Sequence, residues 1–278
     1  MSLESVVKSN KNLRKFIEPF FWWPLAFGID AVKFVRAFRG LPSVIKDYYI
    51  ITRCKVIGGG GKFKIRFAVP ILDEKFTESG TASGHYFHQD LLVARKIFQR
   101  EPVKHVDIGS RVDGFAAHVA TFRNIEVLDI RTPPTQVTNI IFKQCDFMAP
   151  IGKEWYEYSD SISCLHALEH FGLGRYGDPI DINGHLHGFN NLDKILQSGG
   201  ILYFSVPIGS PQRIDFNGQR VFAINTILEM AKDNFELMEF SYVDDKGDLH
   251  ENVTLDSPSI TNNCDCYYGC GIFEFKKD

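Results

Sequence analysis

The segment from Val103 to Arg131 constrains the fold of this chain more than any other part of it. It contains an apolar run that ends at Asp107, a turn of glycine and serine, a helix-like stretch, and a second apolar run that closes on Asp129: VKHVDIGSRVDGFAAHVATFRNIEVLDIR. This order predicts a βαβ unit, and open α/β sheets bind ligands in the crevice beyond the carboxyl ends of their strands. An acid about twenty residues beyond the glycine turn is placed to accept hydrogen bonds from ribose hydroxyls.

The rest of the chain alternates apolar runs with helix-like segments, which predicts an α/β fold with a doubly wound, mostly parallel sheet. A long polar connection without a predicted helix joins the last two runs, so we expect the last of seven strands to be antiparallel. We also expect a helix over Leu91 to Gln99 and a strand over Lys62 to Val69. The seven strands are expected near residues 103–108, 125–129, 140–145, 160–165, 200–206, 235–242 and 270–276, and further helices near 113–122, 186–197 and 221–233.

Residues 1–84 are expected to form a basic and aromatic N-terminal extension, and residues 85–278 the α/β domain. Cations recur at Lys33, Arg36 and Arg39 with apolar side chains between them, which predicts an amphipathic helix. Two interpretations of this helix are open. It packs on the main domain or on a second subunit, or it lies on an anionic membrane through residues 16–39, with tryptophans at headgroup level.

Composition and charge exclude several classes of protein. The formal net charge is -3, which gives no reason to expect nucleic acid as a partner. The sequence has no run of about eighteen apolar residues, so no ordinary transmembrane helix is expected, and Phe20 to Ile29 lacks the pattern of a signal peptide. We therefore expect a cytoplasmic protein, with peripheral contact to the inner face of the cytoplasmic membrane under the second interpretation above.

Two sequence features resemble ligand sites but lack the spacing that such sites require. Gly58 to Gly61 is not followed by Gly-Lys-Ser/Thr at the right distance, so it predicts a hinge or turn rather than a phosphate loop. Cys264, Cys266 and Cys270 lack the usual C-x2-C spacing and a fourth ligand. We expect no metal site in this protein.

Five motifs follow one another along the chain: VDIGS, VLDIR, QCDF, DSISCLHALEHF and LQSGGILYFSVP. In order and spacing they resemble the motifs of class I S-adenosylmethionine-dependent methyltransferases, over roughly residues 85–278. More narrowly, GHYFHQDLLVARKI and CLHALEHFGLGRYGDPID are similar to an uncharacterised bacterial family whose members are often associated with surface-polysaccharide gene clusters. The resemblance implies a Rossmann-like methyltransferase domain with S-adenosylmethionine as cofactor.

The resemblance also implies which residues hold this cofactor. The family pattern prefers glycine where this chain has Arg111 and Asp113, and these side chains could either crowd the cofactor or form a salt bridge across the turn. The positions that match are Asp107, Gly109, Ser110 and Arg111 for the first loop, Asp129 and Ile130 for the ribose, and Asp146 and Phe147 for the adenine.

The segment Gly84 to Asp90 concentrates side chains that are able to hydrogen-bond. A role in the site would place Tyr86 or Phe87 in stacking contact with cofactor or substrate, and His85 or His88 as an acid, a base or a substrate contact. Helix capping together with one buried, hydrogen-bonded histidine explains the segment equally well.

Methyl transfer to a hydroxyl requires in-line positioning of donor and acceptor and a base for the departing proton. Histidine suits that base because it titrates near neutrality. The resemblance places His166 at the end of the fourth strand, facing the methyl group, and we favour it as the base. His170 and His85 are the alternatives, and Glu169 is placed to orient an imidazole or the cofactor.

The stretch Gly172 to Asp181 is longer and richer in glycine than a plain connection, and loops in such positions commonly carry specificity. Arg175, Tyr176 and Asp178 are candidate contacts of a polar acceptor, by stacking on a sugar ring or by binding carboxylate or phosphate. The polar residues that follow are interpreted as helix capping rather than as a metal site: Asp181, Asn183, His185 and His187.

We interpret the chain as an O-methyltransferase that acts on a sugar hydroxyl of a bacterial surface glycan, such as lipopolysaccharide or capsule, or on its precursor. A nicotinamide-dependent oxidoreductase shares the ribose acid, but the G-x-G-x-x-G sequence is not intact here. A third interpretation, which Arg111 and Asp113 favour, is a catalytically inactive methyltransferase fold that acts as a membrane-attached partner in polysaccharide assembly. The sequence leaves open whether the protein forms a homo-oligomer.

Overall fold

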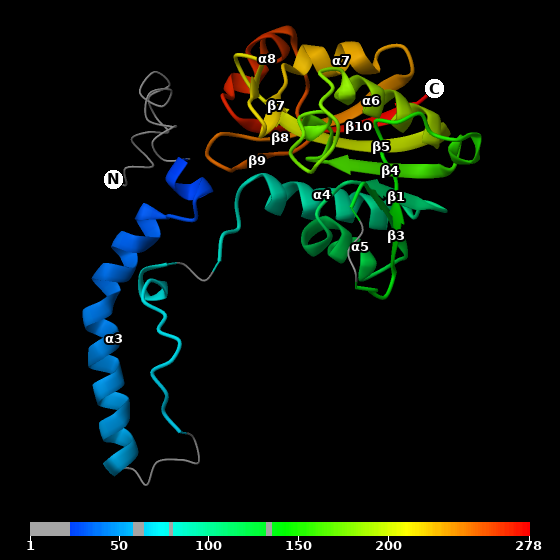
Figure 1. The fold of residues 1–278 in the computed structure, drawn as a ribbon. Coiled ribbons are helices and arrows are strands. Elements are labelled where there is room, and N and C mark those ends of the chain that lie inside the picture. Colours follow the sequence, from blue (N-terminus) through cyan, green and yellow to red (C-terminus); the bar gives the residue numbers. More distant parts are fainter. Residues whose placement is uncertain (1–22, 58–63, 78–79, 132–134) are drawn as a thin grey trace. The chain divides into compact units, whose positions relative to one another are not determined.

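The computed structural model describes residues 23–57, 64–77, 80–131 and 135–278 (Figure 1). The chain divides into two compact units, residues 1–81 and 82–278. The smaller unit contains a long helix, and the larger unit contains the sheet and the helices that cover it.

The described part of the smaller unit contains α3 (Ala31–Ile57) and the short 3-10 helix η1 (Glu74–Phe76). This confirms the predicted N-terminal helical extension. Apolar side chains of α3 are exposed, with Phe34 and Phe38 71% and 73% accessible. In the described part of the chain, no helix has the length and apolar character needed to cross a membrane. Contact of α3 with a membrane surface or with another protein stays a prediction.

Two further expectations fall in this unit. Gly58 to Gly61, and residues 16–22 of the expected membrane contact, lie outside the described residues. The strand expected over Lys62 to Val69 is wrong for residues 64–69, which have no regular secondary structure. A half-buried strand needs partner strands, and within the described residues no strand pairs with this segment.

The larger unit is built on one eight-stranded sheet in the order β3-β2-β1-β4-β5-β10-β8-β9. The strands β1 to β5 are parallel to one another, and β10 is antiparallel to both β5 and β8. This confirms the predicted doubly wound, mostly parallel sheet with an antiparallel last strand. The bounds are β1 (His105–Ile108), β2 (Ile125–Asp129), β3 (Ile140–Gln144), β4 (Ser159–Leu165), β5 (Leu196–Ile208), β8 (Phe235–Val243), β9 (Leu249–His250) and β10 (Gly269–Lys277).

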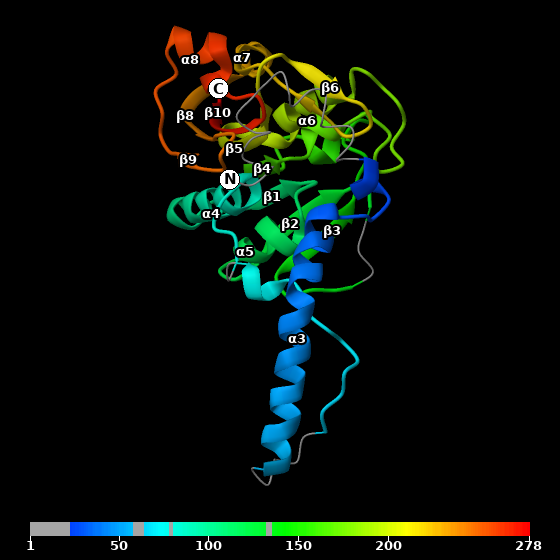
Figure 2. The ribbon, with the colours of Figure 1, turned by 90° about the vertical axis from the view of Figure 1, so that its left-hand side faces the viewer.

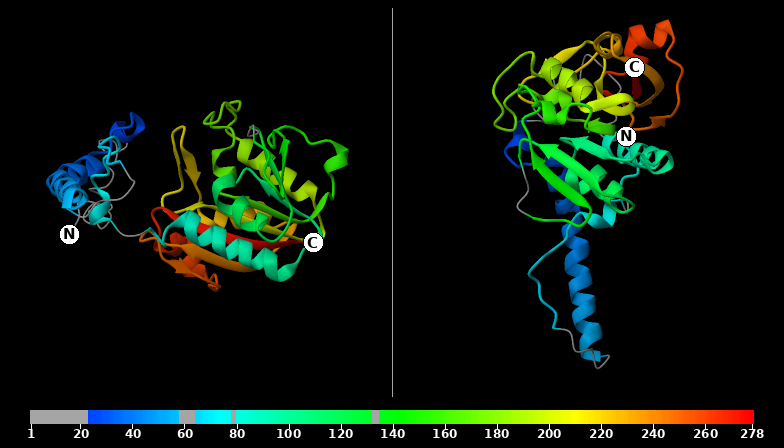
Figure 3. Two further views of the ribbon diagram at one scale, coloured as in Figure 1. Left: turned by 90° about the horizontal axis from the view of Figure 1, so that it is seen from below. Right: turned by 90° about the vertical axis from the view of Figure 1, so that its right-hand side faces the viewer.

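Helices cover both faces of this sheet (Figures 1 and 2). One face carries α4 (His85–Arg100) and α5 (Ala117–Ala120), the latter preceded by a π-helical turn over Val112–Ala116. The opposite face carries α6 (Gly184–Ile195), α7 (Ile224–Ala231) and α8 (Ser257–Asn262). Seen from below, α4 (teal) crosses in front of the strands (Figure 3, left).

Each face of the sheet has its own hydrophobic core because successive side chains of a strand point to opposite faces. On β5, Leu202 and Phe204 pack with α6 and α7, whereas Ile201 and Tyr203 pack with α4. The strand therefore reads as a continuous apolar run, as expected for a parallel strand covered on both sides.

Four features of the larger unit differ from the sequence-based expectation. The helix expected from Leu91 begins at His85, so the polar segment before it is the first turn of α4. A two-residue strand, β9, extends the sheet beyond the expected seven strands, and a separate hairpin pairs β6 (Arg213–Asp215) with β7 (Gln219–Val221). The connection expected to lack a helix contains α8. Asp256 caps the start of this helix, because its side chain accepts a hydrogen bond from Ser259 N at 2.8 Å.

The two hydrophobic cores predict that two phenylalanines contribute very differently to the free energy of unfolding. Phe204 is fully buried against Phe189 and Phe273, whereas Phe216 is 95% exposed. Phe204→Ala should lower the free energy of unfolding by about 3–5 kcal/mol through lost burial and the cavity left behind. Phe216→Ala is the matched control and should change it by less than about 0.5 kcal/mol. Urea unfolding followed by circular dichroism measures both, and equal effects would contradict this packing.

Candidate active site

A cleft of about 550 Å³, open to solvent, lies beyond the carboxyl ends of β1 to β4. The strand order reverses here, since β1 lies between β2 and β4, and such a switch point is where doubly wound sheets bind ligands. The cleft is lined by residues from five segments: Ile108 and Gly109; Leu128, Asp129, Ile130 and Arg131; Cys145, Asp146, Phe147 and Met148; Ala167, His170 and Phe171; and Tyr176 and Asp178.

Gly109 forms the turn that leaves β1 at the bottom of this cleft. Its φ is +70°, and its N–H donates to Leu128 O at 2.9 Å. A Cβ at this position would lie 3.1 Å from the Cβ of Ala167. Only glycine meets both demands without strain, so the backbone is bare where a ligand can approach it closely.

Asp107 shapes this turn but does not line the cleft. Its buried carboxylate accepts hydrogen bonds from Ser110 N at 3.0 Å, from Ser110 Oγ at 2.7 Å and from Ser163 Oγ at 2.5 Å. Burial raises the pKa of Asp107 to about 7, although these hydrogen bonds act in the opposite direction. Asp107 and Ser110 were predicted to bind the cofactor, and in the structure their side chains bind each other.

Asp129 ends β2 with its carboxylate in the cleft. The backbone N–H of Arg131 donates to Asp129 Oδ1 at 2.7 Å, and the Arg131 guanidinium lies 3.3 and 3.4 Å from the two carboxylate oxygens. The same guanidinium lies 4.0 Å from the ring centre of Tyr176. Arg131 thus joins the end of β2 to the loop after β4. The sequence interpretation missed this role of Arg131, although its position two residues after Asp129 was a signal.

Asp146 and Phe147 follow β3 and close the far side of the cleft. Asp146 Oδ1 accepts a hydrogen bond from Met148 N at 2.9 Å, which fixes the turn. Asn191, buried on α6, donates to the carbonyls of Phe147 and Ala149, both at 2.9 Å. Asp146 and Phe147 therefore both line the cleft, held from behind by Asn191, which the sequence analysis did not single out.

Arg111 and Asp113, the departure from the family pattern, form an ion pair across the turn at 2.8 Å. Both side chains are largely exposed, and neither lines the cleft. The Arg111 guanidinium lies 5.4 Å from the ring centre of Tyr86. Of the two alternatives considered, crowding of the cofactor or a salt bridge, the structure has the salt bridge.

His166 follows β4 with a φ of +50° and is almost fully buried. Its Nδ1 lies 2.7 Å from Glu169 Oε1, and its ring stacks on His85 and contacts Tyr86. Burial opposes charging of this ring, but the Cys270 sulfur and the Glu169 carboxylate raise the pKa of His166 well above its ordinary value. Burial and the neighbouring His166 lower the pKa of His85 to about 3.

Of the three candidate histidines, His170 lines the cleft. Its Nδ1 lies 2.7 Å from Gly218 O, and its Nε2 lies 3.6 Å from Glu169 Oε1. The ring of Tyr176 meets it edge to face at 5.5 Å. Burial lowers the pKa of His170, although Glu169 acts in the opposite direction.

The four residues predicted to contact the substrate do not all line the cleft. Tyr176 and Asp178 line the cleft, but the Asp178 carboxylate accepts hydrogen bonds from the backbone N–H groups of Gly172, Gly174 and Tyr176, and so shapes its own loop. Arg175 donates to Gly218 O at 3.1 Å beside His170. His88 lies on α4 against Phe87 and does not line the cleft.

Arg220, on β7, supports the segment that follows β4, and no sequence pattern indicated this role. The buried guanidinium donates to the carbonyls of Phe171 at 2.6 Å, Ile182 at 3.0 Å and Glu169 at 3.3 Å. A buried cation that satisfies three carbonyls fixes both ends of the loop that carries Tyr176. The role depends on the β6–β7 hairpin, which sequence reasoning did not foresee.

The strand order and the cleft at its switch point define a doubly wound α/β protein with the fold of the class I methyltransferases. The chain matches the family DUF268, described as a Caenorhabditis protein of unknown function, over residues 116–265, more than half of its length. It therefore belongs to this family. A comparison with curated proteins finds no match.

Several solved structures resemble the chain at low identity. The 1,6-didemethyltoxoflavin-N1-methyltransferase of Burkholderia thailandensis, crystallised with S-adenosylhomocysteine, aligns with a TM-score of 0.49 and 13% identity over 68% of this chain and 78% of that chain. The N-methyltransferase NodS of Bradyrhizobium japonicum WM9 aligns with a TM-score of 0.45 and 13% identity over 70% and 88%. The YcgJ protein of Bacillus subtilis aligns with a TM-score of 0.45 and 12% identity over 68% and 98%.

The buried Asp107 predicts a pH-dependent stability. Its pKa in the folded protein, about 7, lies above the ordinary value of 3.8, so the folded state holds the proton more tightly than the unfolded state. Its contribution to stability is therefore largest below about pH 4 and is lost as the pH rises to 7. Asp107→Asn cannot titrate, so the stability of the wild type relative to this variant should fall by on the order of 2 kcal/mol between pH 5 and 8.

Urea unfolding of both proteins at the two pH values measures this difference. Asp90, whose pKa burial raises to about 6, is present in both proteins, and its negative charge contributes to the raised pKa of Asp107 that the comparison measures. A difference that stays constant with pH would contradict a buried, titrating Asp107.

Proposed function

We propose that this protein is an S-adenosylmethionine-dependent methyltransferase whose cofactor binds in the cleft. The observation that carries the proposal is the Asp129 carboxylate, which lies in the cleft at the end of β2, beside the bare Gly109 turn. A carboxylate at this position of a βαβ unit accepts hydrogen bonds from ribose hydroxyls. The open turn of β1 and the acid of β2 together favour a nucleoside ligand.

The residues around Asp129 fit the remaining parts of this cofactor. Gly109 leaves backbone accessible to the methionine part, and Phe147, buried beside Cys145 and Met148, offers an apolar wall for the adenine. Arg111 points to solvent in its pair with Asp113, so it leaves the turn unobstructed. The inactive-fold alternative loses its main support for this reason.

Arg131 prepares Asp129 for such a ligand. Its backbone N–H holds one carboxylate oxygen at 2.7 Å, which fixes the orientation of the group. The two side-chain contacts are longer, at 3.3 and 3.4 Å, and Arg131 is half exposed. Ribose hydroxyls would replace these longer contacts without disturbing the backbone bond.

When bound, S-adenosylmethionine supplies an electrophilic methyl group on its sulfonium. His170 is the histidine placed to accept the proton of an attacking hydroxyl, because it lines the cleft. The 2.7 Å contact with Gly218 O assigns the ring proton to Nδ1, which leaves the Nε2 lone pair to accept a proton. Glu169 Oε1, 3.6 Å from Nε2, would stabilise the imidazolium that forms. We therefore assign the base to His170, whereas His166 has its Nε2 outside the cleft.

The acceptor in this proposal is a sugar hydroxyl of a surface glycan or of its precursor. Tyr176, 38% exposed at the mouth of the cleft, offers a ring face of the kind that stacks on sugars. Arg175 stands beside it and could pair with a carboxylate or phosphate of the acceptor. The surface-glycan setting rests on the family resemblance of the sequence.

Calorimetric titration tests the cofactor assignment. The wild type should bind S-adenosylhomocysteine, and Asp129→Ala should weaken it at least about tenfold, since hydrogen bonds to a charged acceptor are worth about 1.5–3 kcal/mol each. Asp233→Ala, an exposed acid just beyond α7, is the matched control and should bind like the wild type. Parallel titration with the oxidised nicotinamide cofactor should show no binding.

Each other outcome overturns part of the proposal. Binding of the nicotinamide cofactor alone would identify an oxidoreductase. Binding of neither compound by folded protein would identify an inactive methyltransferase fold. Binding that survives Asp129→Ala unchanged would place the nucleoside elsewhere.

Substitution of His170 tests the base. With radiolabelled S-adenosylmethionine and a panel of sugars and sugar nucleotides, His170→Gln should lower kcat about 10²- to 10⁴-fold. The affinity for S-adenosylhomocysteine should stay within about twofold, because the variant removes a proton acceptor rather than a ribose contact. His250→Gln, on the edge strand β9, is the control. An unchanged kcat in His170→Gln would move the base to another residue, and cofactor binding without methylation of any sugar would reject the glycan acceptor.

A further inference from the structure

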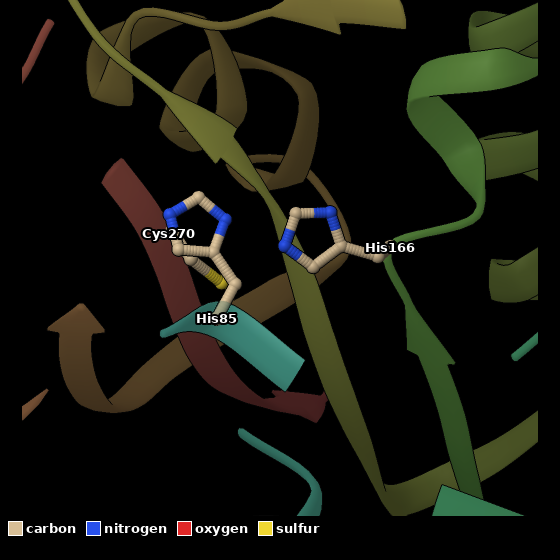
Figure 4. Close-up of side chains that lie close together, drawn as sticks. All are labelled: His85, His166 and Cys270. Carbon is tan, nitrogen blue, oxygen red and sulfur yellow. The ribbon is translucent and has the colours of Figure 1, made fainter. Parts of the chain in front are cut away.

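Three side chains that are distant in sequence meet at the carboxyl edge of the sheet: His85, His166 and Cys270 (Figure 4). His85 is the first residue of α4, His166 follows β4, and Cys270 lies near the start of β10. One imidazole nitrogen from each ring and the Cys270 sulfur lie within 4.8 Å of one another. In Figure 4 the two rings face each other with the sulfur beside them.

The donor set of this cluster is that of a transition-metal site. Two imidazole nitrogens and one thiolate are the ligands that zinc and related divalent ions prefer.

The hydrogen bonds around the cluster orient the histidines as they are oriented in known metal sites. His166 Nδ1 lies 2.7 Å from the fully buried Glu169 carboxylate, and the backbone of Tyr268 bonds the ring of His85. Metal-bound histidines almost always donate their second ring nitrogen to a carboxylate or a backbone carbonyl in this way. Glu169 engages Nδ1 of His166, so Nε2 is the nitrogen that would bind an ion, and it would release its proton on binding.

The Nε2 atom of His166 supports a bound ion independently of the types of ligand in the cluster. Its side chain is only 3% exposed, and within the described residues Nε2 has no hydrogen-bond partner other than the Cys270 sulfur. A buried imidazole nitrogen that faces only a weakly bonding sulfur is available to a ligand or an ion. Here the atom belongs to the ring that faces His85 and Cys270.

The Cys270 sulfur makes only weak hydrogen bonds, so it can exchange them for a bond to an ion. Cys270 Sγ lies 3.7 Å from Gln89 Oε1, a weak thiol contact. Gln89 Oε1 also accepts a hydrogen bond from Ser205 Oγ at 2.6 Å, so the amide stays satisfied when the thiol proton leaves. Donors on a tetrahedral zinc are separated by about 3.4–3.6 Å, so the cluster must contract by roughly 1 Å. His85, on the first turn of α4, is the least buried of the three ligands.

We propose that His85, His166 and Cys270 bind one divalent transition-metal ion, with zinc as the expected occupant. Three protein ligands leave one position of a tetrahedral ion open, which is the arrangement of catalytic rather than structural zinc sites. The cluster lies beside the cleft, since Ala167, which lines the cleft, directly follows His166. This inference departs from the sequence-based expectation of no metal, and it holds whether or not the protein transfers methyl groups.

This cluster differs from the group of three cysteines, Cys264, Cys266 and Cys270, that the sequence analysis considered as a metal site. Within the part of the chain that the structure describes, Cys264 and Cys266 do not join Cys270 in a group of potential ligands, and neither do Asp181, His185 and His187. This contrast supplies a matched control for the experiment.

Cobalt titration of the full chain, purified without a histidine tag and stripped of metal with a chelator, tests the proposal. Co²⁺ alone should give visible bands of four-coordinate cobalt and a thiolate-to-cobalt charge-transfer band, saturating at about one ion per chain and displaced by Zn²⁺. Cys270→Ser should abolish the charge-transfer band, and His85→Gln or His166→Gln should abolish tight binding. Glu169→Gln, which alters the carboxylate that orients His166, should weaken binding about 10- to 100-fold.

Cys266→Ser, a buried cysteine outside the cluster, should bind cobalt like the wild type. Circular dichroism of every variant confirms that it is folded. Absence of cobalt binding by the folded wild type, a charge-transfer band that survives Cys270→Ser, or one that is lost in Cys266→Ser would each overturn the proposal. None of these measurements involves S-adenosylmethionine, so their failure is separate from a failure of the proposed function.

Discussion

The geometry of the cleft depends on one buried carboxylate, that of Asp107. It lies one residue before the end of β1 and accepts hydrogen bonds from the turn that follows and from Ser163 on β4. A single side chain therefore joins the two strands between which the strand order reverses, and it fixes the turn that exposes the Gly109 backbone. Because the protein itself satisfies this carboxylate, the loop has its shape before any ligand binds, and no ordering cost falls on binding.

A second buried carboxylate, Glu169, organises the opposite side of the cleft. Burial alone would raise its pKa, but His166 and His170 hold the pKa of Glu169 below its ordinary value. Its side chain contacts both imidazoles, while its backbone carbonyl and that of Phe171 accept hydrogen bonds from Arg220. The orientation of the two histidines is therefore set together, by a residue that the β6–β7 hairpin holds in place.

Local pattern predicts what depends on neighbours in sequence, and it fails where distant segments meet. The apolar run of β2 ends at Asp129 as expected, because the alternation of strand and helix is a local signal. Nothing local indicates that β10 inserts between β5 and β8, yet this pairing brings Cys270 to the edge where β4 ends. The side chains of Arg111 and Asp113 likewise left two outcomes open, and only their positions in the folded turn decide between them.

The two roles considered for His166 exclude each other, since one lone pair cannot accept a proton and coordinate an ion at the same time. The geometry separates these roles between two histidines. Nε2 of His166 belongs to the cluster with His85 and Cys270, whereas His170 lines the cleft beside Tyr176. A proton acceptor alone would require one histidine and one carboxylate. The additional imidazole and the buried sulfur are explained when this edge of the sheet serves two neighbouring sites that share Glu169.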